Sequence, residues 1–298
     1  MTSQQREALE THLTSTGQPM ASAEWLDAHY ETCRPEYEAL VRSVGIEPGW
    51  RVLDAGCGGG NYLPLLAELV GPAGRLHALD VAPENIATVE ARVVDWRLPC
   101  PVEARVGTLT APLPYRDDSF DALWCANVLQ YLTDDALAAT LAEFRRVVRP
   151  GGIVAVKDDE VGLWVVSPGD PARYWRLFER LTSPDDALGV AMRGAFRGRA
   201  LRGWLERAGL VDVWQRTTLI ERWASLGPAE RAYMGRYLAF LAEQAETVAV
   251  PDGDLAFCRA QRDPTALEHL VHHPEFYWCE ANPVAVGRVP LDRDRQPR

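Results

Sequence analysis

A glycine-rich turn between a short apolar strand and an amphipathic helix indicates the chemistry of this sequence most directly. Asp54 ends the apolar run and begins the turn, whose other key positions are Gly56, Gly58 and Gly60. Glycine permits positive φ and lets the main chain approach a ligand closely. A strand, a glycine turn and a helix in this order place backbone N–H groups against a nucleoside ligand.

The spacing of these glycines separates two classes of nucleotide-binding protein. The dinucleotide fingerprint G-x-G-x-x-G requires a third glycine at position 61, where this chain has Asn61. The pattern D-x-G-x-G-x-G from Asp54 to Gly60 instead resembles the first motif of the class I S-adenosylmethionine-dependent methyltransferases. The resemblance implies that the turn, with Cys57, packs against the methionine part of the cofactor. A tight turn with no ligand remains the alternative.

A second carboxylate stands at the end of the second expected strand. Asp80 follows the run Leu76–Leu79, and a carboxylate at a strand tip can accept both hydroxyls of a ribose. NAD-binding proteins place an acid in the same way, so Asp80 supports a nucleoside ligand in general more than a methyl donor in particular. A helix N-cap is the alternative role. The resemblance implies that the next residue, Val81, lines the adenine.

The resemblance covers roughly residues 35–160 and implies further cofactor contacts. Many relatives have an aspartate where this chain has Thr108, whose hydroxyl can accept the same hydrogen bond without charge. Leu109 can contribute through its backbone. The segment after the fourth strand matches the crossing where the strand order should reverse and open a ligand crevice. We expect three of its residues at the cofactor edge and active site: Cys125, Asn127 and Gln130.

Methyl transfer from a sulfonium is an in-line displacement, for which an enzyme mainly supplies positioning and exclusion of water. A hydroxyl or amine acceptor also needs a proton acceptor. The candidate catalytic residues are His29 and Tyr30, in N-terminal helices that would close over the cofactor, and Asp158 and Glu160, at the end of the fifth strand. Plain packing or local turn chemistry is the alternative for each of the four.

Short apolar strands that alternate with amphipathic helices predict an α/β fold. We expect a doubly wound, mostly parallel Rossmann-like sheet with helices on both faces and an antiparallel final strand. Pro150-Gly151-Gly152 predicts the end of a helix and a turn before the fifth strand. The strands are expected at 51–55, 75–79, 102–106, 119–125 and 152–157, and the helices at 60–70, 83–95 and 134–148.

The chain is expected to have three parts. Residues 1–45 form N-terminal helices, broken at Pro35, that act as a lid. Residues 46–160 form the S-adenosylmethionine-binding core. Residues 161–298 complete the sheet and carry helical cap insertions, which are larger than a minimal class I fold needs and favour a roofed acceptor pocket. The expected elements of this part are insertions at about 161–200 and 224–274 and strands at 211–222 and 275–289.

Composition and charge limit the kinds of partner that this protein is expected to bind. The net charge of −11 would repel the phosphates of a nucleic acid. No apolar run approaches the roughly 18 residues of a membrane helix, and the first residues lack the apolar stretch of a signal peptide. The six cysteines show no C-x-x-C spacing, which favours free thiols in a reducing compartment and no metal site. We therefore expect a cytoplasmic protein that binds neither nucleic acid nor membranes.

These features together predict an enzyme that transfers a methyl group from S-adenosylmethionine to a small organic metabolite, natural-product-like or quinone-like. Two other functions stay open at this point. The same fold could use bound S-adenosylmethionine as a scaffold for a cyclisation or another step without methyl transfer. The third is an NAD-dependent oxidoreductase, which Asn61 disfavours.

Overall fold

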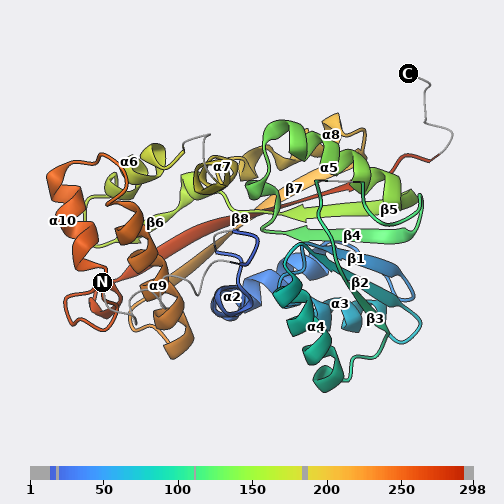
Figure 1. The fold of residues 1–298 in the computed structure, drawn as a ribbon, viewed down its shortest axis with the longest axis horizontal. Coiled ribbons are helices and arrows are strands. Elements are labelled where there is room, and N and C mark those ends of the chain that lie inside the picture. Colours follow the sequence, from blue (N-terminus) through green and yellow to red (C-terminus); the bar gives the residue numbers. More distant parts are fainter. Residues whose placement is uncertain (1–13, 18–19, 111, 183–186, 292–298) are drawn as a thin grey trace.

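A single twisted sheet forms the centre of the molecule. The computed structural model describes residues 14–17, 20–110, 112–182 and 187–291 (Figure 1). Within these residues, eight strands pair in the order β3-β2-β1-β4-β5-β8-β6, and β7 pairs with β8. The predicted doubly wound, mostly parallel sheet is confirmed. Its parallel strands are β1 (Arg51–Ala55), β2 (Arg75–Asp80), β3 (Val102–Val106), β4 (Phe120–Ala126) and β5 (Val148–Lys157).

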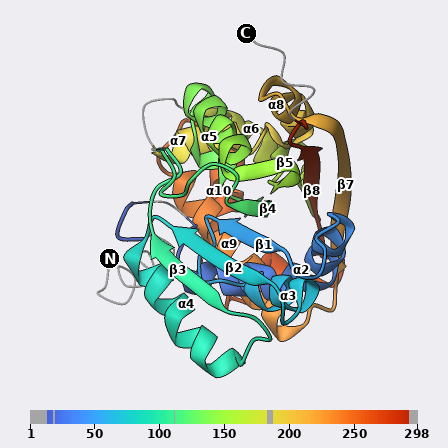
Figure 2. The ribbon, with the colours of Figure 1, turned by 90° about the vertical axis from the view of Figure 1, so that its right-hand side faces the viewer.

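Helices cover both faces of this sheet (Figure 2), because its central strands bury side chains on both sides. One hydrophobic cluster joins the sheet to α2 (Ala23–Ser43), α3 (Leu63–Val70) and α4 (Pro83–Trp96). Another cluster joins it to α5 (Asp134–Val147) and α8 (Leu201–Arg207). Because these five strands run in the same direction, their carboxyl ends meet at one edge of the sheet.

The last strand extends the sheet in the opposite direction, as predicted. β8 (Tyr277–Arg288) pairs antiparallel with β5, with β6 (Val165–Ser167) and with the long β7 (Val211–Trp223). This arrangement carries β8 beyond the parallel strands and towards a second group of helices (Figure 1). Polar residues in the middle of β8 thereby reach the region between the sheet and these helices.

A second hydrophobic core lies beside the parallel strands. Its helices come from both long segments after β5, and Trp25 of α2 also packs into it. No helix among the described residues combines the length and the apolar character that a bilayer crossing needs. The helices of this core are α6 (Arg173–Arg180), α7 (Ala187–Gly194), α9 (Pro228–Gln244) and α10 (Asp252–Ala260), and short 3-10 turns lie at Leu129–Tyr131, Val161–Leu163, Gly198–Ala200 and Leu270–His272.

The prediction of two N-terminal helices broken at Pro35 is wrong, because α2 runs unbroken through that residue. A proline inside a helix removes one hydrogen bond and costs about 3 kcal/mol. The helix buries Trp25 and Tyr30 before Pro35, and Tyr37 and Val41 after it. Burial of these side chains on both sides of the proline offsets the local cost. Residues 1–13 of the predicted lid lie outside the described residues.

The helix ends before Pro150-Gly151-Gly152, as predicted, because α5 ends at Val147, but the predicted turn before the fifth strand is wrong. β5 begins at Val148, so Pro150-Gly151-Gly152 lies within it. Gly151 adopts φ +75 and donates its N–H to the carbonyl of Val289, while the Gly152 carbonyl accepts from Val289. The pairing of β4 with β5 shifts register at the same place. A local irregularity therefore absorbs the turn residues without ending the strand.

Candidate active site

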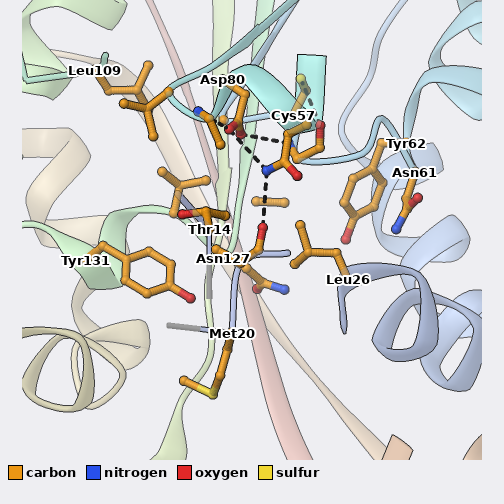
Figure 3. A pocket seen from close by; sticks show the side chains of 18 of the residues that line it. Thr14, Met20, Leu26, Cys57, Asn61, Tyr62, Asp80, Leu109, Asn127 and Tyr131 are labelled. Atoms are coloured by element: carbon orange, nitrogen blue, oxygen red, sulfur yellow. Dashed lines mark hydrogen bonds between the residues drawn. The ribbon is translucent and has the colours of Figure 1, made fainter. Parts of the chain in front are cut away.

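The strand order reverses between β1 and β4, and a cavity of about 250 Å³ opens at the carboxyl ends of the strands there (Figure 3). Ligands of open α/β sheets bind at such a switch point. This cavity adjoins a second one, which is described below, and we refer to the two as the larger and the smaller cavity. Four successive strand ends contribute to its wall, through Gly58 after β1, Asp80 at the end of β2, Thr108 after β3 and Asn127 after β4.

The glycine turn after β1 presents bare main chain to this cavity. Gly56 and Gly58 have φ values of +79 and +52, which favour glycine. A Cβ at Gly58 would overlap the side chain of Leu26 in α2, and a Cβ at Gly56 would overlap Val128. Both Leu26 and Val128 line the larger cavity. The turn therefore stays free of side chains while α2 packs directly over it.

The carboxylate of Asp80 accepts hydrogen bonds from the protein but keeps part of its acceptor capacity for a ligand. Its Oδ2 accepts from the Gly58 N–H at 2.9 Å, and its Oδ1 accepts from the Ala82 N–H at 2.9 Å and from Asn85 Nδ2 at 3.2 Å. A carboxylate offers about four acceptor positions, so one position on Oδ2 remains. The Oδ1 of Asn85 is buried and has no partner among the described residues. Burial raises the pKa of Asp80, and the three hydrogen bonds oppose that shift.

Most of the predicted cofactor residues come together in the larger cavity. Gln130 instead lines a second, smaller cavity. The residues that line the larger cavity are Gly56, Cys57, Gly58, Asp80, Val81, Thr108, Leu109 and Asn127.

Three predicted cofactor residues line neither cavity. Asp54 is buried with one carboxyl oxygen unpartnered among the described residues, and burial together with the charge of Asp80 raises its pKa to about 8. A Cβ at Gly60 would face Leu63 and Val89 rather than a cavity. Cys125 is fully buried in the hydrophobic cluster beneath α5.

The smaller cavity, of about 60 Å³, adjoins the larger one. Leu26, His29, Asn127 and Tyr131 line both spaces. Among the described residues that line the smaller cavity there is no arginine or lysine. Its wall combines three acidic residues, Asp159, Glu160 and Glu280, with aromatic side chains from α2, from the segment after β5 and from α9: Trp25, Trp164, Tyr233 and Tyr237.

The predicted catalytic residues occupy different positions around these spaces. His29 lines both cavities, and Tyr30 lines the larger one. The Tyr30 ring meets Tyr62 edge-on, with 5.1 Å between the ring centroids, and burial raises its pKa to about 12. Glu160 lines the smaller cavity, whereas Asp158 lines neither.

The surroundings of Asp158 and Glu160 argue against a role as base. Glu160 accepts from Gly162 N at 2.9 Å and from three nitrogens of Arg199 at 2.6–2.9 Å. These four bonds use its acceptor capacity. Asp158 is buried, and burial with the charge of Asp159 raises its pKa to about 8.

Several polar residues near the cavities were not predicted from the sequence. Lys157 is fully buried at the end of β5. It is the only lysine in the chain, and this was the one feature of the sequence that could have drawn attention to it. Its Nζ donates to Asn127 Oδ1 at 2.6 Å and thereby fixes a residue that adopts φ +57 between the cavities. Glu280 and Asn282 occupy alternate, buried positions in the otherwise apolar β8.

Comparisons with known proteins agree on one class. Residues 52–152 match the family model described as a methyltransferase domain. Over 122 residues the chain is 37% identical to an uncharacterized 37.1 kDa protein in transposon TN4556 of Streptomyces fradiae, which covers 41% of this chain and 34% of that protein. Over 121 residues it is 31% identical to a 2-phytyl-1,4-naphtoquinone methyltransferase of Trichormus variabilis, with 41% and 52% covered. The chain thus spans between a third and about half of the length of these relatives.

A solved structure shares the fold. A putative methyltransferase from Bacillus halodurans aligns with a TM-score of 0.51 at 15% identity, over 85% of this chain and 98% of that one. The family match identifies residues 52–152 as a methyltransferase domain, and the motifs in it follow the order of the class I S-adenosylmethionine-dependent methyltransferases.

The larger cavity fits the cofactor of this class, S-adenosylmethionine. Gly58 lines the cavity with bare main chain, over which Leu26 packs, and Asp80 keeps an acceptor position. Two buried polar atoms among the residues that line the cavity, Asn85 Oδ1 and the Tyr62 hydroxyl, have no partner among the described residues. A ligand with hydroxyl and amino groups would supply partners for such atoms.

Proposed function

We propose that this chain transfers a methyl group from S-adenosylmethionine to a small organic acceptor, with the cofactor in the larger cavity and the acceptor in the smaller one. The observation that carries the proposal is the junction of the two spaces at His29, Asn127 and Tyr131. In-line displacement requires the nucleophile and the methyl carbon to meet at one point, away from water. Two adjoining cavities with a shared wall support that arrangement.

The residues of the larger cavity have separable tasks in this proposal. When bound, S-adenosylmethionine supplies an electrophilic methyl carbon, because its sulfur carries a positive charge. Asp80 Oδ2 and Asn85 Oδ1 would each accept from a ribose hydroxyl, since the described residues leave at least one position on each. Val81 and Leu109 would contact the adenine through apolar surface. Gly58 would let the main chain approach the methionine part.

The walls of the smaller cavity favour a natural-product-like or quinone-like acceptor. Trp25, Trp164 and Tyr233 offer flat apolar surface to a ring. The 2-phytyl-1,4-naphtoquinone methyltransferase of Trichormus variabilis is named for a ring compound, which supports the same acceptor class here. The net charge of −11 supports a small molecule over a nucleic acid. We also propose a cytoplasmic location, because all six cysteines are buried and unpaired.

The transfer itself is tested with S-adenosylmethionine that carries a labelled methyl group. The full chain is incubated with this donor and with reduced 1,4-naphthoquinone, and the organic product is analysed by mass spectrometry. We expect label in the product and an equal amount of S-adenosylhomocysteine. An acceptor that changes structure without gaining label would point to the scaffold function. Hydride exchange with NAD would point to an oxidoreductase.

A further inference from the structure

His29 stands at the junction of the two cavities and is held from two sides. It belongs to α2, and its ring stacks on Tyr233 of α9 with 4.7 Å between the centroids and 3° between the planes. Its side chain is 10% exposed. Its Nε2 lies 2.9 Å from the Tyr37 hydroxyl and 3.3 Å from Glu280 Oε1. The ring therefore has a fixed orientation in a wall that both cavities share.

Proton counting along one side of this network shows which nitrogen carries hydrogen. Lys157 Nζ donates to the Tyr37 hydroxyl at 2.9 Å. The single proton of that hydroxyl goes to Asn282 Oδ1, at 3.2 Å. With its proton on that bond, Tyr37 accepts from His29, and Nε2 of His29 is the donor.

The other side of the network gives the same answer. Glu280 Oε1 accepts from Asn282 Nδ2 at 3.1 Å and from Cys33 Sγ at 3.3 Å, and Oε2 accepts from Trp278 Nε1 at 3.2 Å. Every bond to this carboxylate comes from a donor, and His29 Nε2 completes the set. A carboxylate that binds one imidazole nitrogen fixes the tautomer and leaves the lone pair on the other.

The second nitrogen of the ring is free for a ligand. Nδ1 has no hydrogen-bond partner among the described residues. It is also not fully buried, so a ligand can reach it. Since His29 lines both cavities, this nitrogen can receive a proton at the place where acceptor and methyl donor would meet. His29, Cys33 and Glu280 also lie close enough to hold a metal ion, with one ligand atom each within 4.8 Å of the others. Their atoms instead satisfy one another by hydrogen bonds.

Charged and titratable groups reach this histidine from each element packed against it. They are Cys33 and Tyr37 on α2, Lys157 on β5, Glu280 on β8 and Tyr233 on α9. Burial of Glu280 favours its neutral form, but its contact with His29, the charge of Lys157 and the hydrogen bond from Cys33 outweigh burial and lower its pKa to about 2. Glu280 is therefore an anion that can stabilise an imidazolium.

The acceptor chemistry follows from the smaller cavity. The indole Nε1 of Trp164 is buried without a partner among the described residues, and it can only donate. An oxygen atom on the bound molecule would satisfy it, whereas an ammonium group would not. The aromatic walls favour a ring, and no arginine or lysine among the described lining residues would balance an anion. A neutral aromatic ring that bears a hydroxyl group meets all three conditions.

We propose that Nδ1 of His29 is the general base that takes the proton from an aromatic hydroxyl in the smaller cavity, and that Glu280 and Tyr37 are the positioning residues that hold its tautomer. This inference rests on the proposed methyl transfer. The O–H bond breaks and its proton moves to Nδ1. The electron pair on oxygen forms the new bond to the methyl carbon, and the C–S pair stays on sulfur. The products are a neutral methyl ether and S-adenosylhomocysteine, and His29 then releases the proton to water.

The tautomer is tested without any acceptor. Long-range proton–nitrogen NMR on the full chain with isotope-labelled histidine distinguishes the two ring nitrogens, and His29→Gln assigns the signal. We expect hydrogen on Nε2 and a lone pair on Nδ1 at neutral pH. A tautomer with hydrogen on Nδ1 would overturn the proposal.

Kinetics test the role, with reduced 1,4-naphthoquinone as the acceptor probe. His29→Gln keeps an amide near the Nε2 position but removes the base, so kcat should fall about 100- to 10,000-fold, with an unchanged circular-dichroism spectrum as evidence of folding. Glu280→Gln should move the acid limb of the pH–kcat profile to lower pH, because the imidazolium loses its anion. A structural role alone would not move that limb. His273→Gln, in a loop outside both cavities, is the matched control.

The outcomes separate the two proposals. Absence of label transfer by the unmodified chain would count against methyl transfer as a whole. A His29→Gln enzyme as fast as the unmodified chain would overturn the role of His29 alone. Loss of activity on chelation would also overturn it, since His29 would then serve as a metal ligand.

Discussion

The carboxylates around the two cavities differ in how much of their hydrogen-bonding capacity the protein itself uses. Glu160 is saturated by Arg199 and Gly162. Asp80 keeps one position on Oδ2. A carboxylate at the end of a strand that has a free acceptor position can bind a ligand. A carboxylate whose acceptor positions are all used by the protein instead stabilises the fold. This difference separates residues that the sequence alone treats alike.

Replacement of Asp80 by alanine should weaken binding of S-adenosylhomocysteine by about 1–3 kcal/mol, as expected for a lost hydrogen bond to a charged group. The measurement is isothermal titration calorimetry on the full chain. Asp95→Ala, at an exposed position of α4, removes a carboxylate outside both cavities and should leave the affinity unchanged. Equal affinities of the Asp80 variant and the unmodified chain would remove Asp80 from the site.

At the scale of elements, α2 connects the parts of the site. Leu26 packs over the bare glycine turn, and His29 and Tyr30 follow on the same helix. The helix stays continuous through Pro35 because it buries side chains in two cores. The local helix-breaking tendency of proline is therefore outweighed by burial that only the folded chain provides.

The elements that local pattern predicts are those of the parallel sheet. The apolar run before Asp54 and the glycines after it lie within a few residues of one another, so the sequence displays the whole strand–turn–helix unit. The wall of the larger cavity is predictable to a large extent for the same reason. Thr108 and Asn127 follow from the order of the strands.

The smaller cavity could not be predicted in the same way. Its polar network pairs His29 of α2 with Glu280 of β8, from opposite ends of the chain, and no local spacing connects them. The aromatic residues Trp25 and Tyr233 likewise meet only through tertiary packing. A sequence pattern can place such residues on a helix or a strand, but the register of β8 decides which of them meet.

At the scale of the whole molecule, two buried acids connect stability to pH. Burial raises the pKa values of Asp54 and Asp158 to about 8 in the folded chain, compared with about 3.9 for an unfolded aspartate. Between these values the folded state binds more protons than the unfolded state. The free energy of unfolding should therefore fall as pH rises through this window, by up to about 1.4 kcal/mol per pH unit for each acid.

Asp158→Asn removes one of these two titrations, so the free energy of unfolding should fall less steeply as pH rises. The measurement is urea unfolding at a series of pH values between about 5 and 8. Asp95→Asn, at an exposed position, should keep the slope of the unmodified chain. An unchanged slope in Asp158→Asn would show that this carboxyl is already ionised in the folded state.

The central claim is that the bare turn after Asp54 and the carboxylate of Asp80 hold a methyl-donor cofactor and not a dinucleotide. Calorimetric titration of the full chain with S-adenosylhomocysteine and, separately, with NAD tests it most directly, and Gly58→Arg, which fills the turn, serves as the reference. The account predicts S-adenosylhomocysteine binding in the micromolar range that Gly58→Arg abolishes, and no heat from NAD. Binding of NAD in place of S-adenosylhomocysteine would contradict it.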